Sequence, residues 1–186
     1  MLEILLASTD DELEQVHRLN SANLKQNLPE EERKTEGFVT WLYPLDLLRR
    51  MHQLTPSIIA KDGDKVVAYA LATPREAASF HPDLKTLLSY LDTLEYRGRP
   101  FREYNYYCMG QICIHKDYRG QKLLPQLYLK HQEIYSSRYS MLVTEISTSN
   151  LRSQKAHEKA GFKTIHTYSD AMDEWNVVAL EWGEEA

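Results

Sequence analysis

The sequence has few cysteines, and they follow neither a redox nor a metal-binding spacing. Only Cys108 and Cys113 occur among 186 residues. If both lie on one strand, their odd spacing places them on opposite faces, so they cannot form a disulfide with each other. Such thiols fit a reducing compartment, and we expect a cytoplasmic protein. The histidines show no HExxH or comparable spacing, so the sequence predicts no metal site.

Long apolar runs are also missing. No stretch approaches the roughly 20 apolar residues that cross a bilayer. The first residues have no basic region and turn acidic at once, so we expect no signal peptide. The net charge of −5 argues against a nucleic-acid partner. The motifs GxxxxGK[ST] and GxGxxG are absent, which disfavours a nucleotide-binding α/β domain.

What the sequence does contain is a block over 106–162 in which strands and helices alternate. Tyr106 to Ile114 is rich in aromatic and β-branched residues, so it predicts a buried strand. A polar turn over 117–120 follows. Apolar residues at helical spacing from Lys122 then predict a helix with Pro125 in its first turn. A helix N-terminus beside a basic loop offers N–H groups and positive charge, so this loop is a candidate anion site.

The second half of the block predicts another strand and helix. Leu142 to Ser147 reads as a strand, and Asn150 is a good helix N-cap. One face of the helix then carries Ser153, Ala156, His157 and Ala160. Gly161 follows at the left-handed position that ends many helices.

The segments IHKDYRGQKLL and NLRSQKAHEKAGF, in that order, resemble the acyl-CoA motif and the second signature of the GNAT superfamily of acyl-CoA-dependent N-acyltransferases. The resemblance implies an α/β fold, the GNAT fold, with a mixed central sheet of about seven strands flanked by helices. It also implies acetyl-CoA as acyl donor and a primary amine as acceptor. The sequence departs from the family pattern at Lys122 and Leu124, which replace glycines, and at His157, which replaces a tyrosine.

The resemblance assigns a cofactor site to the strand at 106–114, to the loop that follows it and to the helix that begins after Asn150. The backbone N–H groups near Ile112 to Ile114 would face the thioester oxygen, and those of the loop would meet the pyrophosphate. Asn150 would contact the pantetheine arm besides capping its helix. The expected cofactor-binding residues are Ile112, Cys113, Ile114, Arg119, Gly120, Gln121, Lys122, Leu123, Leu124, Asn150 and Ser153.

Two catalytic residues are expected. His157 stands where the family places a tyrosine, so it is either the acid that protonates the leaving thiolate or a packed helix residue. Glu145, on the neighbouring strand, is the candidate general base; Glu103 and the tyrosines at 104, 106 and 107 are its rivals. Cys113 could accept an acyl group, although a small buried residue is the commoner role of such a cysteine.

The rest of the chain predicts a single GNAT domain over 1–186. Helices are expected at 9–24, at 36–43 and at 45–51, a polar connection at 27–34, and hairpins at 57–73 and 163–182. The aromatic cluster Phe38, Trp41 and Tyr43 is either a core flap or a wall of the substrate pocket. An insertion over 75–103 contains an amphipathic leucine helix. It could cover the acceptor site, contact a second subunit, or cover a sheet edge.

The function that these patterns favour is acetyl transfer from acetyl-CoA to a primary amine of a small molecule or peptide. The protein would act as a monomer or homodimer, without nucleic acid or membrane. The alternative is a catalytically idle GNAT domain that binds acyl-CoA as a sensor or interaction module.

Overall fold

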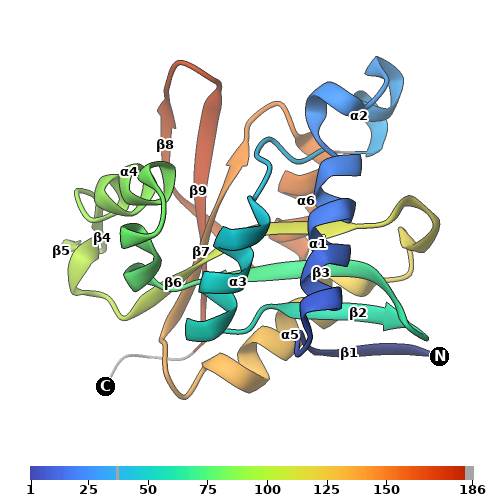
Figure 1. Ribbon diagram of the computed structural model, residues 1–186. Coiled ribbons are helices and arrows are strands. Elements are labelled where there is room, and N and C mark those ends of the chain that lie inside the picture. Colours follow the sequence, from blue (N-terminus) through green and yellow to red (C-terminus); the bar gives the residue numbers. More distant parts are fainter. Residues whose placement is uncertain (37, 183–186) are drawn as a thin grey trace.

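A seven-stranded mixed sheet runs through the protein (Figure 1). The computed structural model describes residues 1–36 and 38–182. The strands lie in the order β1-β2-β3-β6-β7-β9-β8, and only β6 and β7 are parallel. This arrangement confirms the predicted fold class. The strands are β1 (Leu2–Leu6), β2 (Ile58–Asp62), β3 (Lys65–Thr73), β6 (Tyr106–Ile114), β7 (Met141–Ser147), β8 (Lys163–Ser169) and β9 (Glu174–Glu181).

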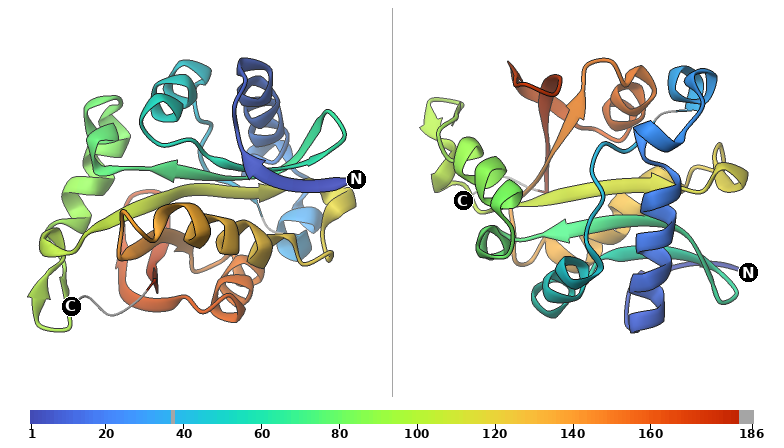
Figure 2. Two further views of the ribbon diagram at one scale, coloured as in Figure 1. Left: turned by 90° about the horizontal axis from the view of Figure 1, so that it is seen from below. Right: turned by 45° about the horizontal axis from the view of Figure 1, so that its top comes forward.

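Helices cover both faces of the sheet, as Figure 2 shows in its left panel. One face carries α1 (Asp10–Ala22), α3 (Leu45–Leu54) and α4 (Pro82–Leu91), and the other carries α5 (Leu123–Tyr135) and α6 (Leu151–Lys159). The local signals explain where several of them begin. Thr9 and Glu12 form a capping box at the start of α1, and Asn150 caps α6 by accepting from the Ser153 N–H. Pro125 lies in the first turn of α5, where its missing N–H costs nothing.

β6 contains an irregularity that matters for the site. Ala70 pairs with Ile112 and Ala72 pairs with Met109, so β6 holds one residue more than β3 between these pairs. Such a bulge bends a strand and re-aims its peptide groups. Gly110 lies in it, and a side chain there would overlap the hydroxyl groups of Tyr43 and Thr73.

Beyond this bulge β6 and β7 separate. Their pairing covers only Tyr106, Tyr107 and Cys108 of β6 with Met141, Leu142 and Val143 of β7. The right panel of Figure 2 shows the two strands diverging from their shared start. The centre of the sheet is therefore open toward the C-terminal ends of these strands.

The helix predicted over 36–43 does not form at residues 38–43, while residue 37 lies outside the described residues. The chain instead forms α2 (Glu30–Glu36), which begins inside the polar connection expected at 27–34, and residues 38–44 contain no helix. Glutamates in the first turn of α2 favour a helix because they complement its positive end. The later stretch is held extended by tertiary contacts: Asn20 donates to the Trp41 carbonyl at 3.0 Å and accepts from the Tyr43 N–H at 2.8 Å.

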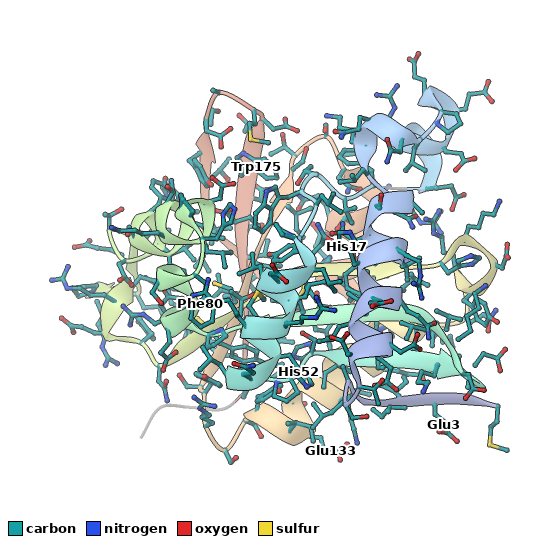
Figure 3. All side chains as sticks on the ribbon, in the orientation of Figure 1. Glu3, His17, His52, Phe80, Glu133 and Trp175 are labelled. Carbon is teal, nitrogen blue, oxygen red and sulfur yellow. The ribbon has the colours of Figure 1, made fainter. Side chains whose placement is uncertain are left out.

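The 75–103 segment forms α4, the short hairpin β4 (Glu95–Tyr96) and β5 (Arg99–Pro100), and flanking 3₁₀ turns. Leu88, Leu91 and Phe101 of this segment are buried against β6, β7 and β9. Burying each such side chain contributes about 1.5–3 kcal/mol. Phe80 is labelled in Figure 3 between α4 and α3. The central carbon of the Arg50 guanidinium lies 4.1 Å from the centre of the Phe80 ring. The 75–103 segment thus contributes to the hydrophobic core and also covers this part of the sheet.

Candidate active site

Two cavities meet where β6 and β7 diverge. The larger, of about 640 Å³, lies against the N-terminus of α5 and one side of α6. The smaller, of about 330 Å³, lies between α4, the 38–43 stretch and the β8–β9 hairpin. The residues that line both are Phe38, Val39, Ile112, Asn150 and Ser153. A molecule in one cavity can therefore reach a molecule in the other through the gap in the sheet.

Backbone donors of β6 face this gap. The His115 N–H donates to the Val67 carbonyl of β3 at 2.8 Å. Successive N–H groups of a strand point to opposite edges, so those of Ile112 and Ile114 point away from β3, toward the side where β7 has left. Preorganised N–H groups of this kind can stabilise an oxyanion without reorganisation.

The loop before α5 has the geometry of an anion site. Gly120 has φ +78° and Lys122, the N-cap residue of α5, has φ +58°. Lys122 thus takes the left-handed conformation that a glycine favours, at a cost of about 1–2 kcal/mol. The first N–H groups of α5 and the side chains of Lys122, Arg152, Lys155 and Lys159 surround the larger cavity.

The predicted cofactor residues come together here with one exception. Ile112, Cys113, Ile114, Arg119, Gly120, Lys122, Leu123, Leu124, Asn150 and Ser153 all line the larger cavity. Gln121 does not; its amide donates to the Asp117 carbonyl at 3.2 Å. Cys113 is buried, and burial raises the pKa of its thiol to about 12, which opposes a nucleophilic role.

The Arg119 side chain is occupied by the protein itself. It donates to the Ile114 carbonyl at 3.0 Å, to Asn23 at 2.9 Å and to Glu36 at 3.1 Å. Glu36 also accepts from Arg152 at 2.9 Å. Arg119 therefore joins α1, α2 and β6 at the edge of the larger cavity. Neither Asn23 nor Glu36 is close to the motifs in sequence, so pattern reasoning missed both.

Glu145 lies on β7 in the smaller cavity. Burial raises the pKa of its carboxyl from 4.5 to about 7, while a hydrogen bond from the Tyr168 hydroxyl, at 2.7 Å, opposes the rise. A carboxyl with this pKa is matched to proton abstraction near neutral pH. The rival bases Glu103, Tyr104, Tyr106 and Tyr107 line neither cavity.

His157 is 2% exposed and has both ring nitrogens engaged. Its Nδ1 lies 2.8 Å from the Ser153 carbonyl, to which only a protonated nitrogen can donate, so Nε2 accepts from the Tyr128 hydroxyl at 2.6 Å. Burial lowers the pKa of His157 to about 4, so the ring is neutral near pH 7. These contacts favour the packed-helix interpretation over the acid.

The walls of the smaller cavity include residues that the sequence alone did not reveal. Tyr168, Asp170 and Trp175 come from the C-terminal hairpin, and Trp175 is labelled on β9 in Figure 3. Leu84, Leu87 and Leu91 of α4 form another wall. Phe38, Trp41 and Tyr43 line the same cavity, which favours their interpretation as a pocket wall.

Within residues 1–36 and 38–182, no group of three or more histidine, cysteine or carboxylate residues is placed to hold a metal ion. Over the same part of the chain, no helix is both long and apolar enough to cross a membrane.

The family model of the acetyltransferase (GNAT) family matches residues 15–162. The chain therefore belongs to the GNAT family, which confirms the predicted resemblance, and it is an acetyltransferase whose family uses acetyl-CoA as acyl donor. No curated protein sequence matches the chain.

Solved structures share the fold at low sequence identity. The ribosomal-protein-S18-alanine N-acetyltransferase from Escherichia coli superposes with a TM-score of 0.65 at 12% identity, over 100% of this chain and 97% of the other. The structure of yncA from Salmonella typhimurium with its cofactor acetyl-CoA has a TM-score of 0.64 at 15% identity, over 100% and 96%. An N-acetyltransferase from Staphylococcus aureus Mu50 has a TM-score of 0.64 at 18% identity, over 98% and 99%.

Proposed function

We propose that this protein transfers the acetyl group of acetyl-CoA to the primary amine of a small molecule or peptide. The observation that carries the proposal is the divergence of β6 and β7, which joins a basic cavity to an acidic, aromatic one. A donor in the first cavity and an amine in the second could meet only at this gap. Holding two reactants in contact is itself a large part of such catalysis.

The larger cavity suits the donor. Its lysines and the N-terminus of α5 would hold the phosphate groups, with Gly120 allowing close backbone approach. The carbonyl oxygen of the thioester would lie toward the N–H groups of Ile112 and Ile114. Asn150 and Ser153, which line both cavities, would contact the arm between phosphate and thioester.

The smaller cavity suits the acceptor. An ammonium group must lose a proton before its nitrogen can attack, and Glu145 would take that proton. The nitrogen then bonds to the acetyl carbon and the carbon–sulfur bond breaks. The thiolate takes the second proton that the nitrogen loses, so the products are an amide and the CoA thiol. A thiolate with a pKa near 8.5 leaves readily. We therefore assign His157 to the support of α6 and not to proton donation.

The test of the proposal uses two glycines with the same backbone conformation. Gly120 and Gly98 have φ +78° and +75°, and no atom lies within 4 Å of where a side chain would begin at either. Aspartate adds the same strain and charge at both, but only Gly120 lines the larger cavity. Gly120→Asp should weaken acetyl-CoA binding in calorimetry by at least about tenfold, since the carboxylate repels phosphate. Gly98→Asp should leave it unchanged.

The same preparation decides between an enzyme and an idle binding module. Release of CoA thiol over a panel of primary amines is expected in the wild-type protein and is the sign of turnover. Equal acetyl-CoA affinity in both glycine variants would overturn the loop assignment. Normal binding with no thiol release on any amine would favour the sensor or interaction module.

A further inference from the structure

The walls of the smaller cavity are mostly apolar and aromatic. Aromatic side chains come from two separate parts of the chain: Phe38, Trp41 and Tyr43 before α3, and Tyr168 and Trp175 in the β8–β9 hairpin. The third wall is the leucine face of α4, formed by Leu84, Leu87 and Leu91. An acceptor that fills this space gains most by burying apolar surface.

The charged groups of the cavity carry one sign. Glu145 lies inside, and Asp83 and Asp170 are exposed lining residues. Among the described residues that line it there is no lysine or arginine. An ammonium group is attracted to such a site. A carboxylate carried next to the amine would meet three acids and no cation among these lining residues, which disfavours such an acceptor.

The aromatic wall is held in place by the residues behind it. Gln111, at the bulge of β6, donates to the Trp41 carbonyl at 2.8 Å and accepts from the Tyr69 hydroxyl at 2.5 Å. The rings of Trp41 and Tyr43 pack edge to face with centroids 4.3 Å apart. The pocket is thus formed before an acceptor arrives, and a cavity of about 330 Å³ lies at the small end of ligand sites.

We propose that the acceptor is a small primary amine on an apolar or aromatic body, with no carboxylate beside the amine. The inference rests on the proposed acetyl transfer, whose acceptor class it specifies. The ring or alkyl body packs between α4, Trp41 and Trp175, and the amine points to Glu145. Free amino acids are disfavoured by charge, and simple polar amines leave the apolar walls unfilled.

Four amines separate these contributions. 2-Phenylethylamine has both ring and amine, ethylamine lacks the ring, and phenylalanine adds a carboxylate to 2-phenylethylamine. Phenylalaninamide has the bulk of phenylalanine without its charge. With acetyl-CoA saturating, kcat/KM for 2-phenylethylamine should exceed that for ethylamine and for phenylalanine by at least about tenfold each. Phenylalaninamide should fall within a few-fold of 2-phenylethylamine.

A pair of leucine variants locates the effect in this cavity. Leu87→Lys places a cation in the α4 wall, and Leu129→Lys makes the same change on α5 at a leucine that is 63% exposed and lines neither cavity. Leu87→Lys should lower kcat/KM for 2-phenylethylamine about tenfold or more and narrow the gap to phenylalanine. Leu129→Lys should change neither, and acetyl-CoA affinity should be normal in both.

The outcomes distinguish this inference from the function on which it rests. If kcat/KM for ethylamine equals that for 2-phenylethylamine, the proposed acceptor class is overturned. The same holds if kcat/KM for phenylalanine equals that for phenylalaninamide. In both cases the proposal of acetyl transfer stands. A kcat/KM for a free peptide N-terminus that is tenfold above that for 2-phenylethylamine would also overturn the acceptor class. Binding of the four amines to the CoA-saturated protein, followed by thermal shift, gives the order of preference even without turnover. If that order is absent, the inference fails.

Discussion

At the scale of single residues, Glu145 has the proton affinity that an amine acetyltransferase needs from a base. Burial raises the pKa of its carboxyl to about 7, and the hydrogen bond from the Tyr168 hydroxyl keeps the pKa from rising further. The deprotonated form accepts the proton, so the rate should rise with pH through about 7. Because Tyr168→Phe removes a bond to the charged carboxylate, it should move this rise to higher pH. Glu145→Gln should remove the rise and lower kcat/KM by about 10²–10⁴-fold.

A matched control exists for the tyrosine variant. Tyr96 also donates to a carboxylate, Glu181, at 2.7 Å, and neither residue lines a cavity. Tyr96→Phe removes a bond of the same kind at a distance from the chemistry, so it should leave the pH–rate profile where it is. The measurement is kcat/KM for one amine between pH 5.5 and 9. An unshifted profile in Tyr168→Phe would sink the assignment of Glu145 as the titrating base.

His157, expected to be either an acid or a packed helix residue, has both ring nitrogens in hydrogen bonds. A neutral ring with both nitrogens bonded inside the protein is a packing element, so His157→Phe should leave turnover within a few-fold. It should lower the free energy of unfolding by about 1–3 kcal/mol, because the buried Tyr128 hydroxyl loses its acceptor. Adding Tyr128→Phe should recover part of this loss in a double-mutant cycle by urea unfolding. A fall in turnover of a hundredfold or more in a folded His157→Phe protein would instead support His157 as the acid that protonates the leaving thiolate.

Residues with a local signature were predictable from the sequence. Gly120, Asn150 and Gly161 are defined by the conformation or cap that their own turn requires. Tyr168 and Trp175 have no such signature, because their role depends on the far end of the chain folding back beside β7. Glu36 and Asn23 are equally remote from the loop that they hold.

At the scale of elements, periodicity predicted the strands well and failed in one place. The apolar residues between 38 and 43 do recur at helical spacing, but hydrogen bonds from Asn20 and Gln111 keep this stretch extended. Those bonds connect residues far apart in the sequence. The acidic residues in the first turn of α2 do favour a helix, because their charge complements the helix dipole. The sequence analysis followed the apolar pattern instead and missed this helix.

The 75–103 segment shows how an element can serve two purposes. Its helix α4 presents Leu84 and Leu87 to the smaller cavity, while Leu88 and Phe101 pack into the core over β6 and β7. Replacing the whole segment with a short turn would expose that core. Single substitutions on the cavity face, such as the one at Leu87, are therefore the informative changes.

At the scale of the whole molecule, β6 and β7 share only three residue pairs, fewer than any other two neighbouring strands of this sheet. On one side of this junction lie β1, β2, β3 and β6, and on the other lie β7, β9 and β8. Regions with few shared contacts can open separately, at a lower free energy than global unfolding. Acetyl-CoA would touch both sides, through Ile112 and Leu123 on the first and Asn150 and Lys155 on the second.

Hydrogen exchange can measure how the two sides are coupled. Without ligand, amides of β8 and β9 should exchange at a lower opening free energy than those of β2 and β3. Acetyl-CoA at a hundred times its Kd should raise the lower value by about 2.7 kcal/mol, because opening must then release the ligand. If β8 and β9 gain no protection, the ligand does not bridge the junction.

The same junction would give bound acetyl-CoA a mechanical role. A ligand that contacts both sides of the junction would restrain the motion of one side against the other. When CoA leaves, that restraint would be lost, and the three residue pairs shared by β6 and β7 would again be the strand pairing that joins the two parts of the sheet.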